Sequence, residues 1–240
     1  MLAKSRPDWF TISHSGPALL KGTANPPGFA WPGGVNLSIR GLRLVRVVEA
    51  SPRTNFPAQC PERHIEGDGK FCLGIAADDV GNAKDAARWW ESLRHFLLCQ
   101  TVAERSGVWP ADYALDHGAA GEHHEKALEL ASELGIDEEY ERAHANEPSW
   151  ISDPKSRIVD RDGRPINGRM PCPLGCTWRK RGHTVTRLRA ECKQREKVTS
   201  LVLTERERRK ELDRYWQAFR RRGVKCCGTM RDCPLMDVAS

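Results

Sequence analysis

The most constraining feature of this sequence is the uneven distribution of its cysteines. Six of the nine lie between residues 172 and 233. Charge divides in the same way, because residues 1–145 carry 15 basic and 20 acidic side chains whereas residues 146–240 carry 23 and 12. Such asymmetry between two halves indicates separate regions. We therefore predict an acidic body over 1–145, a loop-like linker over 146–169 and a basic, cysteine-rich region over 170–240.

The composition is that of a soluble protein with a real hydrophobic core. Apolar residues make up 39% of the chain and charged residues 29%, which is ordinary for a folded domain. The N-terminal segment lacks the apolar stretch of a secretory signal, and no apolar run has the length of a membrane span. We expect a cytoplasmic protein without membrane contact, whose cysteines serve as metal ligands or reactive thiols rather than as disulfides.

Short strands precede helices in the predicted body. Strand-forming runs are expected at 17–22, 35–39 and 42–48, the last two joined by a hairpin turn. Asn82 and Asp85 predict the start of a helix that continues to about residue 102. Two further helices are predicted over 119–134 and from 137 to before 148, the first of them ended by Gly135. This order indicates an α+β fold.

A turn precedes Cys72 between the strands and the helices. Asp68-Gly69 is a strong turn dipeptide, and it directs the residues that follow back along the preceding strand. The string Asp68-Gly69-Lys70-Phe71-Cys72-Leu73 resembles the D-G-x-[IF]-C-L active-site signature of ubiquitin-conjugating enzymes. A histidine, His64, lies upstream, and the approach over 52–61 is rich in proline. The resemblance covers roughly residues 30–135.

The resemblance implies a UBC-like body, an antiparallel sheet with C-terminal helices, and a transferase activity. Cys72 would accept a ubiquitin-like protein from an activating enzyme as a thioester and pass it to an amine of a protein substrate. A thiol suits both steps because its thiolate is a strong nucleophile. No small-molecule cofactor is implied. Bacterial relatives typically accompany an activating enzyme and a ubiquitin-like protein, and several such systems act in antiphage defence.

The sequence departs from the family pattern just before the cysteine. The usual His-Pro-Asn triplet is replaced by His64-Ile65-Glu66, and the spacing to Cys72 is about two residues shorter than in the family. The supporting role of the asparagine is therefore unassigned. His64 could act structurally, whereas Glu66 or Asp68 could orient or deprotonate an incoming lysine. The predicted site comprises Cys72, His64 and Asp68.

The first three cysteines differ in their context. The alternative to a reactive Cys72 is a small buried side chain, since free cysteine is among the most buried residues. Cys99 falls near the apolar stripe of a predicted helix, so we expect it in the core. Cys60 precedes a proline, and nothing around it in the sequence indicates chemistry.

A second polar segment lies at residues 109–123. His117 and His123 are candidates for a wall near the reactive thiol. The favoured interpretation is simpler: Asp116 caps the helix that begins near Ala119, and both histidines lie on the surface of that helix.

Paired cysteines in the C-terminal region predict a metal site. Cys172 and Cys176 are separated by Pro-Leu-Gly, a small turn-forming interior that lets two thiolates face one ion. With Cys226 and Cys233 they would form a structural zinc site of four thiolates. Zinc would stabilise a region that is too poor in apolar residues to fold alone. The alternatives that the sequence leaves open are Cys192, Cys227 and His183.

The basic region also raises a second hypothesis. Thr204 and Glu207 form a capping-box pattern that predicts a helix from there to Gly223. Runs of arginine and lysine at 179–181 and 220–222 are compatible with a zinc-dependent nucleic-acid-binding protein. However, the aromatic residues of this helix lie on its apolar stripe, which favours packing over base stacking. We therefore do not expect a nucleic acid as partner, and a basic surface suits an acidic protein equally well.

Overall fold

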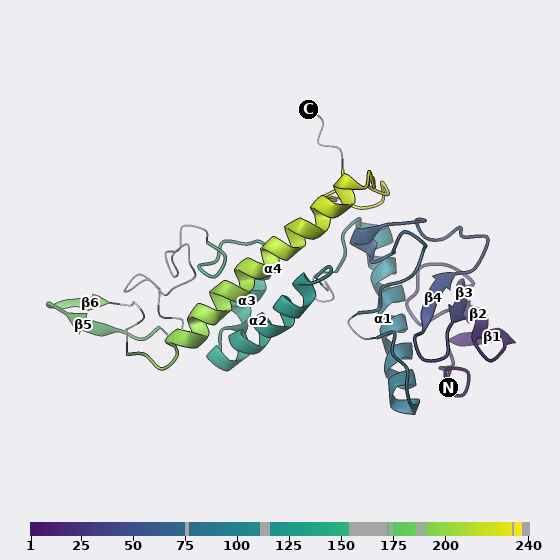
Figure 1. Cartoon of the computed structure of the whole chain (residues 1–240), viewed down its shortest axis with the longest axis horizontal. Helices are drawn as coiled ribbons and strands as arrows, with labels where there is room; N and C mark the ends of the chain where they lie inside the picture. The colour runs from purple at the N-terminus through teal and green to yellow at the C-terminus, as the bar shows by residue number, and fades with distance from the viewer. Residues whose placement is uncertain are drawn as a thin grey trace. The chain divides into compact units, whose positions relative to one another are not determined.

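The computed structural model describes residues 1–74, 77–110, 116–153, 172, 175–185, 188, 191–231 and 233–236. The chain folds into two units. Unit 1 contains Met1–Leu115 and also Arg220–Ser240, whereas unit 2 contains Asp116–Phe219. The predicted α+β class is confirmed, because an antiparallel sheet precedes the helices (Figure 1).

A four-stranded antiparallel sheet forms the first part of unit 1, and its strands are neighbours in sequence order. The strands are β1 (Phe10–Ser15), β2 (Leu19–Ala24), β3 (Val35–Arg40) and β4 (Arg46–Glu49). The strands predicted at 17–22 and 35–39 are confirmed as β2 and β3. β1 has no counterpart among the predicted strands. Most of its residues are exposed or half-buried, so it lacks a strong apolar pattern.

The predicted strand over 42–48 begins four residues late, at Arg46. Gly41 adopts a positive φ of 116°, a conformation that glycine tolerates and other residues rarely adopt. The chain therefore turns out of the sheet after β3. Leu42 and Leu44 are both 73% exposed, and so these two apolar residues contribute no inward face to a strand.

One hydrophobic core joins this sheet to helix α1 (Ala83–Ser106), which lies beside the strands in Figure 1. Side chains at alternate positions of β3 and at helical spacing in α1 are buried together, as the two periodicities require. The core includes Val35, Leu37, Ile39, Trp89, Leu93 and Leu97.

Both ends of α1 follow from local chemistry. The side-chain oxygen of Asn82 accepts a hydrogen bond from the backbone N–H of Asp85 at 3.0 Å, which confirms the predicted cap. The helix ends at Gly107, whose φ of 68° suits the residue that follows a helix. Cys99 is buried in α1, as predicted.

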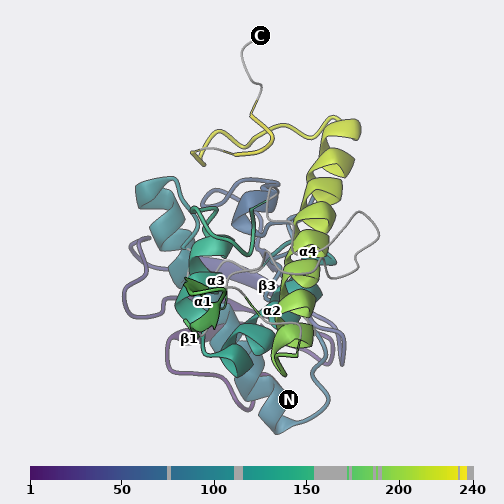
Figure 2. The ribbon, with the colours of Figure 1, turned by 90° about the vertical axis from the view of Figure 1, so that its left-hand side faces the viewer.

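The described residues of unit 2 form three helices with a small core of their own. They are α2 (Ala120–Leu134), α3 (Asp137–His144) and α4 (Arg195–Arg221), of which α4 ends two residues beyond the boundary of unit 2. α2 and α4 run side by side (Figure 1; Figure 2). Gly135 ends α2 with a φ of 67°, as predicted. A short hairpin of β5 (Trp178–Lys180) and β6 (His183–Val185) precedes α4.

Helix α4 begins at Arg195, so the start predicted at Thr204 is wrong. Thr204 is buried inside the helix. The apolar stripe extends N-terminally through Val198, Leu201 and Val202, which pack in the core of unit 2. Packing of this face continues the helix past a sequence that resembles a cap, because burial outweighs a local capping preference.

The folded units do not follow the division by charge. Acidic α2 and basic α4 belong to the same unit, where Lys197 lies 2.9 Å from Glu133. The part of the predicted linker that the structure describes, 146–153, contains the buried Ile151 of the unit 2 core; residues 154–169 lie outside the described residues. None of the helices in the described ranges combines the length and apolar character that a membrane span requires.

Candidate functional site

Cys72 is held in a small, closely bonded loop of unit 1. Cys60 and Ile65 pair as an isolated antiparallel bridge, and Ile65 pairs in turn with Phe71. The backbone N–H of Phe71 donates to the carbonyl oxygen of Val47 in β4 at 3.0 Å, which ties the loop to the sheet. The loop carrying Cys72 is therefore positioned by β4 on one side and by the Cys60–Ile65 turn on the other.

The extended run around Cys72 alternates between core and surface. Phe71 and Leu73 are buried, whereas Cys72 between them is half-buried. Burial raises the pKa of the Cys72 thiol above its ordinary value, and the hydrogen bond from the backbone N–H of Gly74 opposes that effect. The side chain is thus neither a fully buried core residue nor an activated thiolate at rest.

Three charged residues surround this thiol. Lys70 places its Nζ 2.7 Å from Asp78 Oδ2 and 3.4 Å from Glu66 Oε1. Glu66 and Asp78 raise the pKa of Cys72, whereas Lys70 lowers it. Asp78 was not among the predicted site residues. It stands six positions after the cysteine in a loop, where no spacing rule links it to the thiol; only the folded chain brings it there.

Asp68 has a structural position in the turn. Its Oδ1 accepts a hydrogen bond from the backbone N–H of Lys70 at 3.0 Å, and its carboxylate pairs with Arg46. The hydrogen bond from Lys70 and the charge of Arg46 hold the pKa of Asp68 below its usual range. A carboxylate with these partners stabilises the turn that presents Cys72, and its basicity is lowered.

His64 contacts the Cys72 loop through its backbone and packs its ring inside unit 1. It is 6% exposed and adopts a left-handed φ of 55° at the end of the short helix η1 (Pro61–Arg63). Its ring packs on Trp109 with centroids 4.9 Å apart. The backbone carbonyl oxygen of His64 accepts the N–H of Cys72 at 2.9 Å. These contacts favour the structural alternative for His64.

The C-terminal segment of unit 1 reaches the same loop. The guanidinium of Arg63 is fully buried and donates to Gln100 at 2.7 Å, Glu104 at 3.0 Å and Thr229 at 3.1 Å. The backbone N–H of Arg231 donates to the carbonyl oxygen of Gly107 at 2.6 Å. Thr229 is thereby bound to the turn that precedes Cys72, and Arg231 to the end of α1.

The six C-terminal cysteines fall into two groups. In unit 2, Cys176 shares a hydrogen bond with Cys172 and lies within electrostatic range of Cys192. In unit 1, Cys226 shares a hydrogen bond with Cys233. Each predicted pair is therefore accompanied by further cysteines of its own unit, and a joint site of Cys172, Cys176, Cys226 and Cys233 stays a prediction.

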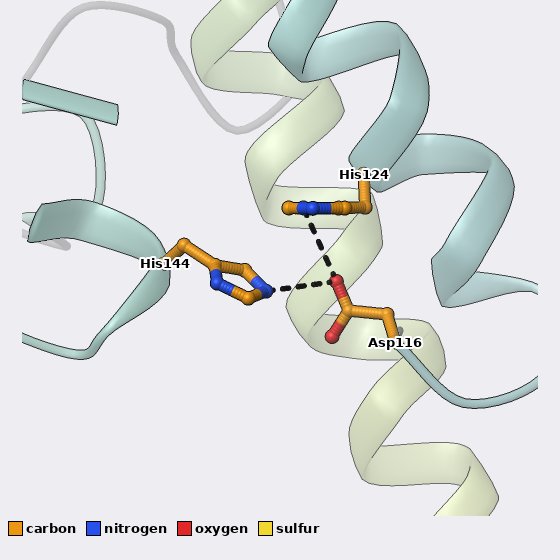
Figure 3. Close-up of side chains that lie close together, drawn as sticks. All are labelled: Asp116, His124 and His144. Atoms are coloured by element: carbon orange, nitrogen blue, oxygen red, sulfur yellow. Dashed lines mark ion pairs between the residues drawn. The ribbon is translucent and has the colours of Figure 1, made fainter. Parts of the chain in front are cut away.

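Unit 2 contains a half-buried polar cluster that the sequence did not reveal (Figure 3). Asp116 Oδ2 lies 3.5 Å from His124 Nδ1 and 3.4 Å from His144 Nε2. Burial lowers the pKa of His124 to about 4, so the imidazole is neutral at physiological pH. The three ligand atoms are close enough to hold a metal ion.

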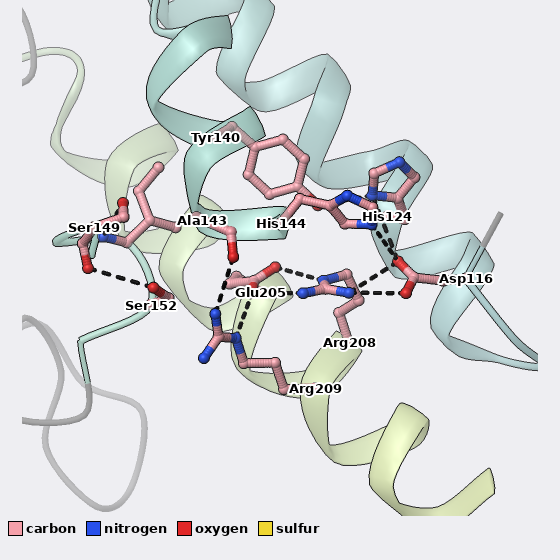
Figure 4. A network of polar contacts seen from close by, with 11 residues as sticks. Asp116, His124, Tyr140, Ala143, His144, Ser149, Ser152, Glu205, Arg208 and Arg209 are labelled. Carbon is pink, nitrogen blue, oxygen red and sulfur yellow. Dashed lines mark hydrogen bonds and ion pairs between the residues drawn. The ribbon is translucent and has the colours of Figure 1, made fainter. Parts of the chain in front are cut away.

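Two arginines give this cluster a balanced charge without an ion (Figure 4). Arg208 Nη1 lies 2.8 Å from Asp116 Oδ1, and Arg208 Nε lies 2.6 Å from Glu205 Oε2. Arg209 Nε lies 2.6 Å from the other oxygen of Glu205. Two carboxylates thus meet two guanidinium groups. Burial alone would raise the pKa of Asp116, but His144 and Arg208 hold it below its usual range. The arrangement is that of a satisfied structural network.

The structure also decides the roles predicted around Asp116. Asp116 does not cap α2, which begins after Ala119 without a side-chain cap. His117 stacks on Tyr215 of α4 with centroids 4.8 Å apart, and burial lowers its pKa to about 4. It therefore contributes to packing within unit 2. His123 is half-buried on α2.

Two family models match the chain. Residues 29–111 match a model described as a prokaryotic E2 domain, and this segment contains the Cys72 loop. Residues 116–235 match a model described as a cysteine-rich domain, C-terminal to E2 domain. No curated protein and no solved structure matches the chain. Because the cysteine-rich model spans half of the sequence and follows the E2 match in the expected order, the chain belongs to the bacterial E2-like family in which a cysteine-rich domain follows the E2 domain.

Proposed function

We propose that the protein is a ubiquitin-conjugating-like transferase that carries a ubiquitin-like protein as a thioester on Cys72. The observation that supports this function best is the position of Cys72. Its half-buried thiol lies on a loop held by backbone pairing, within the segment that matches the prokaryotic E2 domain. Because both reactants are proteins, a shallow, fixed thiol serves this chemistry better than a deep pocket.

The first step is a thiol exchange. The Cys72 thiolate attacks the thioester carbon that joins the ubiquitin-like protein to the activating enzyme, and the thiolate of that enzyme leaves. Burial and the nearby carboxylates keep the resting thiol protonated. Lys70 and the backbone N–H of Gly74 stabilise the anion when it forms. The same stabilisation helps Cys72 leave again in the second step.

The second step transfers the modifier to an amine. The incoming lysine must lose a proton before its nitrogen attacks the thioester carbon, so a carboxylate beside the thiol is useful. Glu66 and Asp78 meet this need, since each acts electrostatically on Cys72. Asp68 is the weaker candidate because its carboxylate is held by the turn and by Arg46.

The proposal also includes the partner proteins of this chain and a metal site in unit 2. An activating enzyme and a ubiquitin-like protein would be the partners, in a bacterial antiphage system of the kind that the family resemblance implies. Cys172, Cys176 and Cys192 would bind a structural zinc ion in unit 2. Cys176 shares a hydrogen bond with Cys172 and lies within electrostatic range of Cys192, and zinc prefers such thiolate ligands.

The function is tested with an activating enzyme and a ubiquitin-like protein from the genome that encodes this chain. Incubation with ATP should give an adduct that dithiothreitol cleaves, and Cys72→Ala should abolish it. Cys72→Ser should instead give an oxyester that resists dithiothreitol. Cys99→Ala is the matched control, because this thiol is buried in α1. A cleavable adduct that persists in Cys72→Ala contradicts the proposal.

A further inference from the structure

Four cysteines that are distant in sequence gather in unit 1. The Sγ atoms of Cys60 and Cys227 lie 2.9 Å apart, although 167 residues separate them. Cys226 shares a hydrogen bond with Cys233. Cys233 also acts electrostatically on Cys60, which places the two pairs near one another. Cys60 belongs to the E2 segment and the other three to the end of the cysteine-rich segment.

Each of these four sulfurs accepts a hydrogen bond from a backbone N–H. Gly228 donates to Cys226 at 3.4 Å, and its φ of 78° forms the turn that makes this possible. The other three sulfurs are reached in the same way by the residues two or three positions later; the acceptor and donor pairs are Cys60 with Arg63, Cys227 with Thr229 and Cys233 with Leu235. Hydrogen bonds to ligand atoms orient those atoms for a metal ion.

A carboxyl oxygen near these sulfurs lacks a polar partner. Glu62 Oε2 is buried without a hydrogen-bond partner. The cation that acts on Cys227 is Arg63, but its guanidinium already pairs with Glu104. A site with four sulfur donors and an orphaned carboxylate oxygen fits a soft divalent cation.

We propose that Cys60, Cys226, Cys227 and Cys233 together bind one zinc ion. Four thiolates are the usual ligands of a structural zinc site. In this site the ion would draw the Cys60–Cys227 and Cys226–Cys233 pairs together. It would bind the C-terminal segment to Cys60, which pairs with Ile65. Ile65 pairs in turn with Phe71, the neighbour of Cys72. Cys60 is the ligand that the sequence alone did not single out.

Zinc content per full-length chain tests this assignment. The protein is purified under reducing conditions, dialysed against metal-free buffer and measured by mass spectrometry of the metal. Cys60→Ser should contain about one zinc ion less than the wild type, and Cys99→Ser should contain as much as the wild type. A Cys60→Ser protein with unchanged zinc overturns the proposal. A loss of the same ion in Cys172→Ser would instead favour the joint site of Cys172, Cys176, Cys226 and Cys233.

Thiol mapping of the wild type keeps the test valid if Cys60→Ser fails to fold. The chain is treated with iodoacetamide before and after a zinc chelator, and the modified cysteines are identified by peptide mass. We expect Cys226 and Cys227, both half-buried, to react only after chelation, whereas Cys72 reacts in both cases. Equal modification with and without chelator contradicts the zinc site. So does a Cys60–Cys227 disulfide in the freshly purified protein.

Discussion

The backbone N–H of Cys72 donates a hydrogen bond of 2.9 Å to the carbonyl oxygen of His64. His64 precedes Cys72 in the sequence and thus supports it through the main chain. Its ring points to Trp109. This geometry separates two roles that the sequence could not distinguish, support of the loop and participation in chemistry.

A substitution at His64 should therefore affect folding more than carrier activity. Asparagine tolerates the left-handed backbone that His64 adopts, so His64→Asn should keep the bond to Cys72. Loss of ring packing should lower the free energy of unfolding by about 1–3 kcal/mol. Thermal melting and thioester formation are measured together. A folded His64→Asn protein that forms no thioester would show that the imidazole takes part in the reaction.

The reactivity of Cys72 should depend on pH in a predictable direction. Because its pKa is raised, the alkylation rate should rise about tenfold per pH unit while the pH stays below that pKa. Glu66→Gln removes a charge that raises the pKa, so its profile should move to lower pH. Lys70→Met should move it to higher pH. Rates of iodoacetamide modification of Cys72, read by peptide mass, give both profiles; shifts in the reverse directions would contradict the assignment.

Asp78 should matter for transfer and not for loading. Asp78→Asn removes a carboxylate beside the thiol, and the rate of thioester discharge to free lysine at neutral pH should fall about tenfold or more. Formation of the thioester should change little. Asp79→Asn is the matched control, because Asp79 pairs with the exposed Arg43. Equal discharge by the two variants would remove Asp78 from the proposed site.

Arg208 should be essential to the stability of unit 2. Arg208→Met removes one of the two guanidinium groups that pair with the carboxylates of Asp116 and Glu205. The free energy of unfolding should therefore fall by about 3–5 kcal/mol. Arg214→Met removes an exposed ion pair with Glu211, so its free energy of unfolding should stay within about 0.5 kcal/mol of the wild-type value. Hydrogen exchange along α4 and thermal melting report the difference. Similar protection in both variants would mean that the network contributes little.

Local signals in the sequence predicted those elements whose determinants are neighbours in the chain. Asn82 with Asp85 predicted the start of α1, and Gly135 predicted the end of α2. The Asp68-Gly69 turn is likewise present, with a φ of 80° at Gly69. Each signal depends on the backbone of a few adjacent residues, so tertiary packing did not alter it.

The parts that could not be predicted depend on distant residues. Asp78, His124 and His144 have no spacing that relates them to Cys72 or Asp116, and only folding brings them together. The capping pattern at Thr204 failed for a related reason, since burial of the preceding turns continued α4 through it. Cys60 and Cys227 are in contact although 167 residues separate them, and no pattern in a single sequence predicts such a contact.

The return of residues 220–240 to unit 1 makes unit 2 an insertion, with both of its chain ends attached to the same host domain. A fragment that stops at residue 111, where the E2 match ends, would lose two hydrogen bonds to the C-terminal segment. These are the bond from Arg63 to Thr229 and the bond from the backbone N–H of Arg231 to Gly107. Unit 1, which contains the E2 match, is therefore discontinuous in sequence. An expression fragment that respects the fold must keep the C-terminus, even where it dispenses with the residues in between.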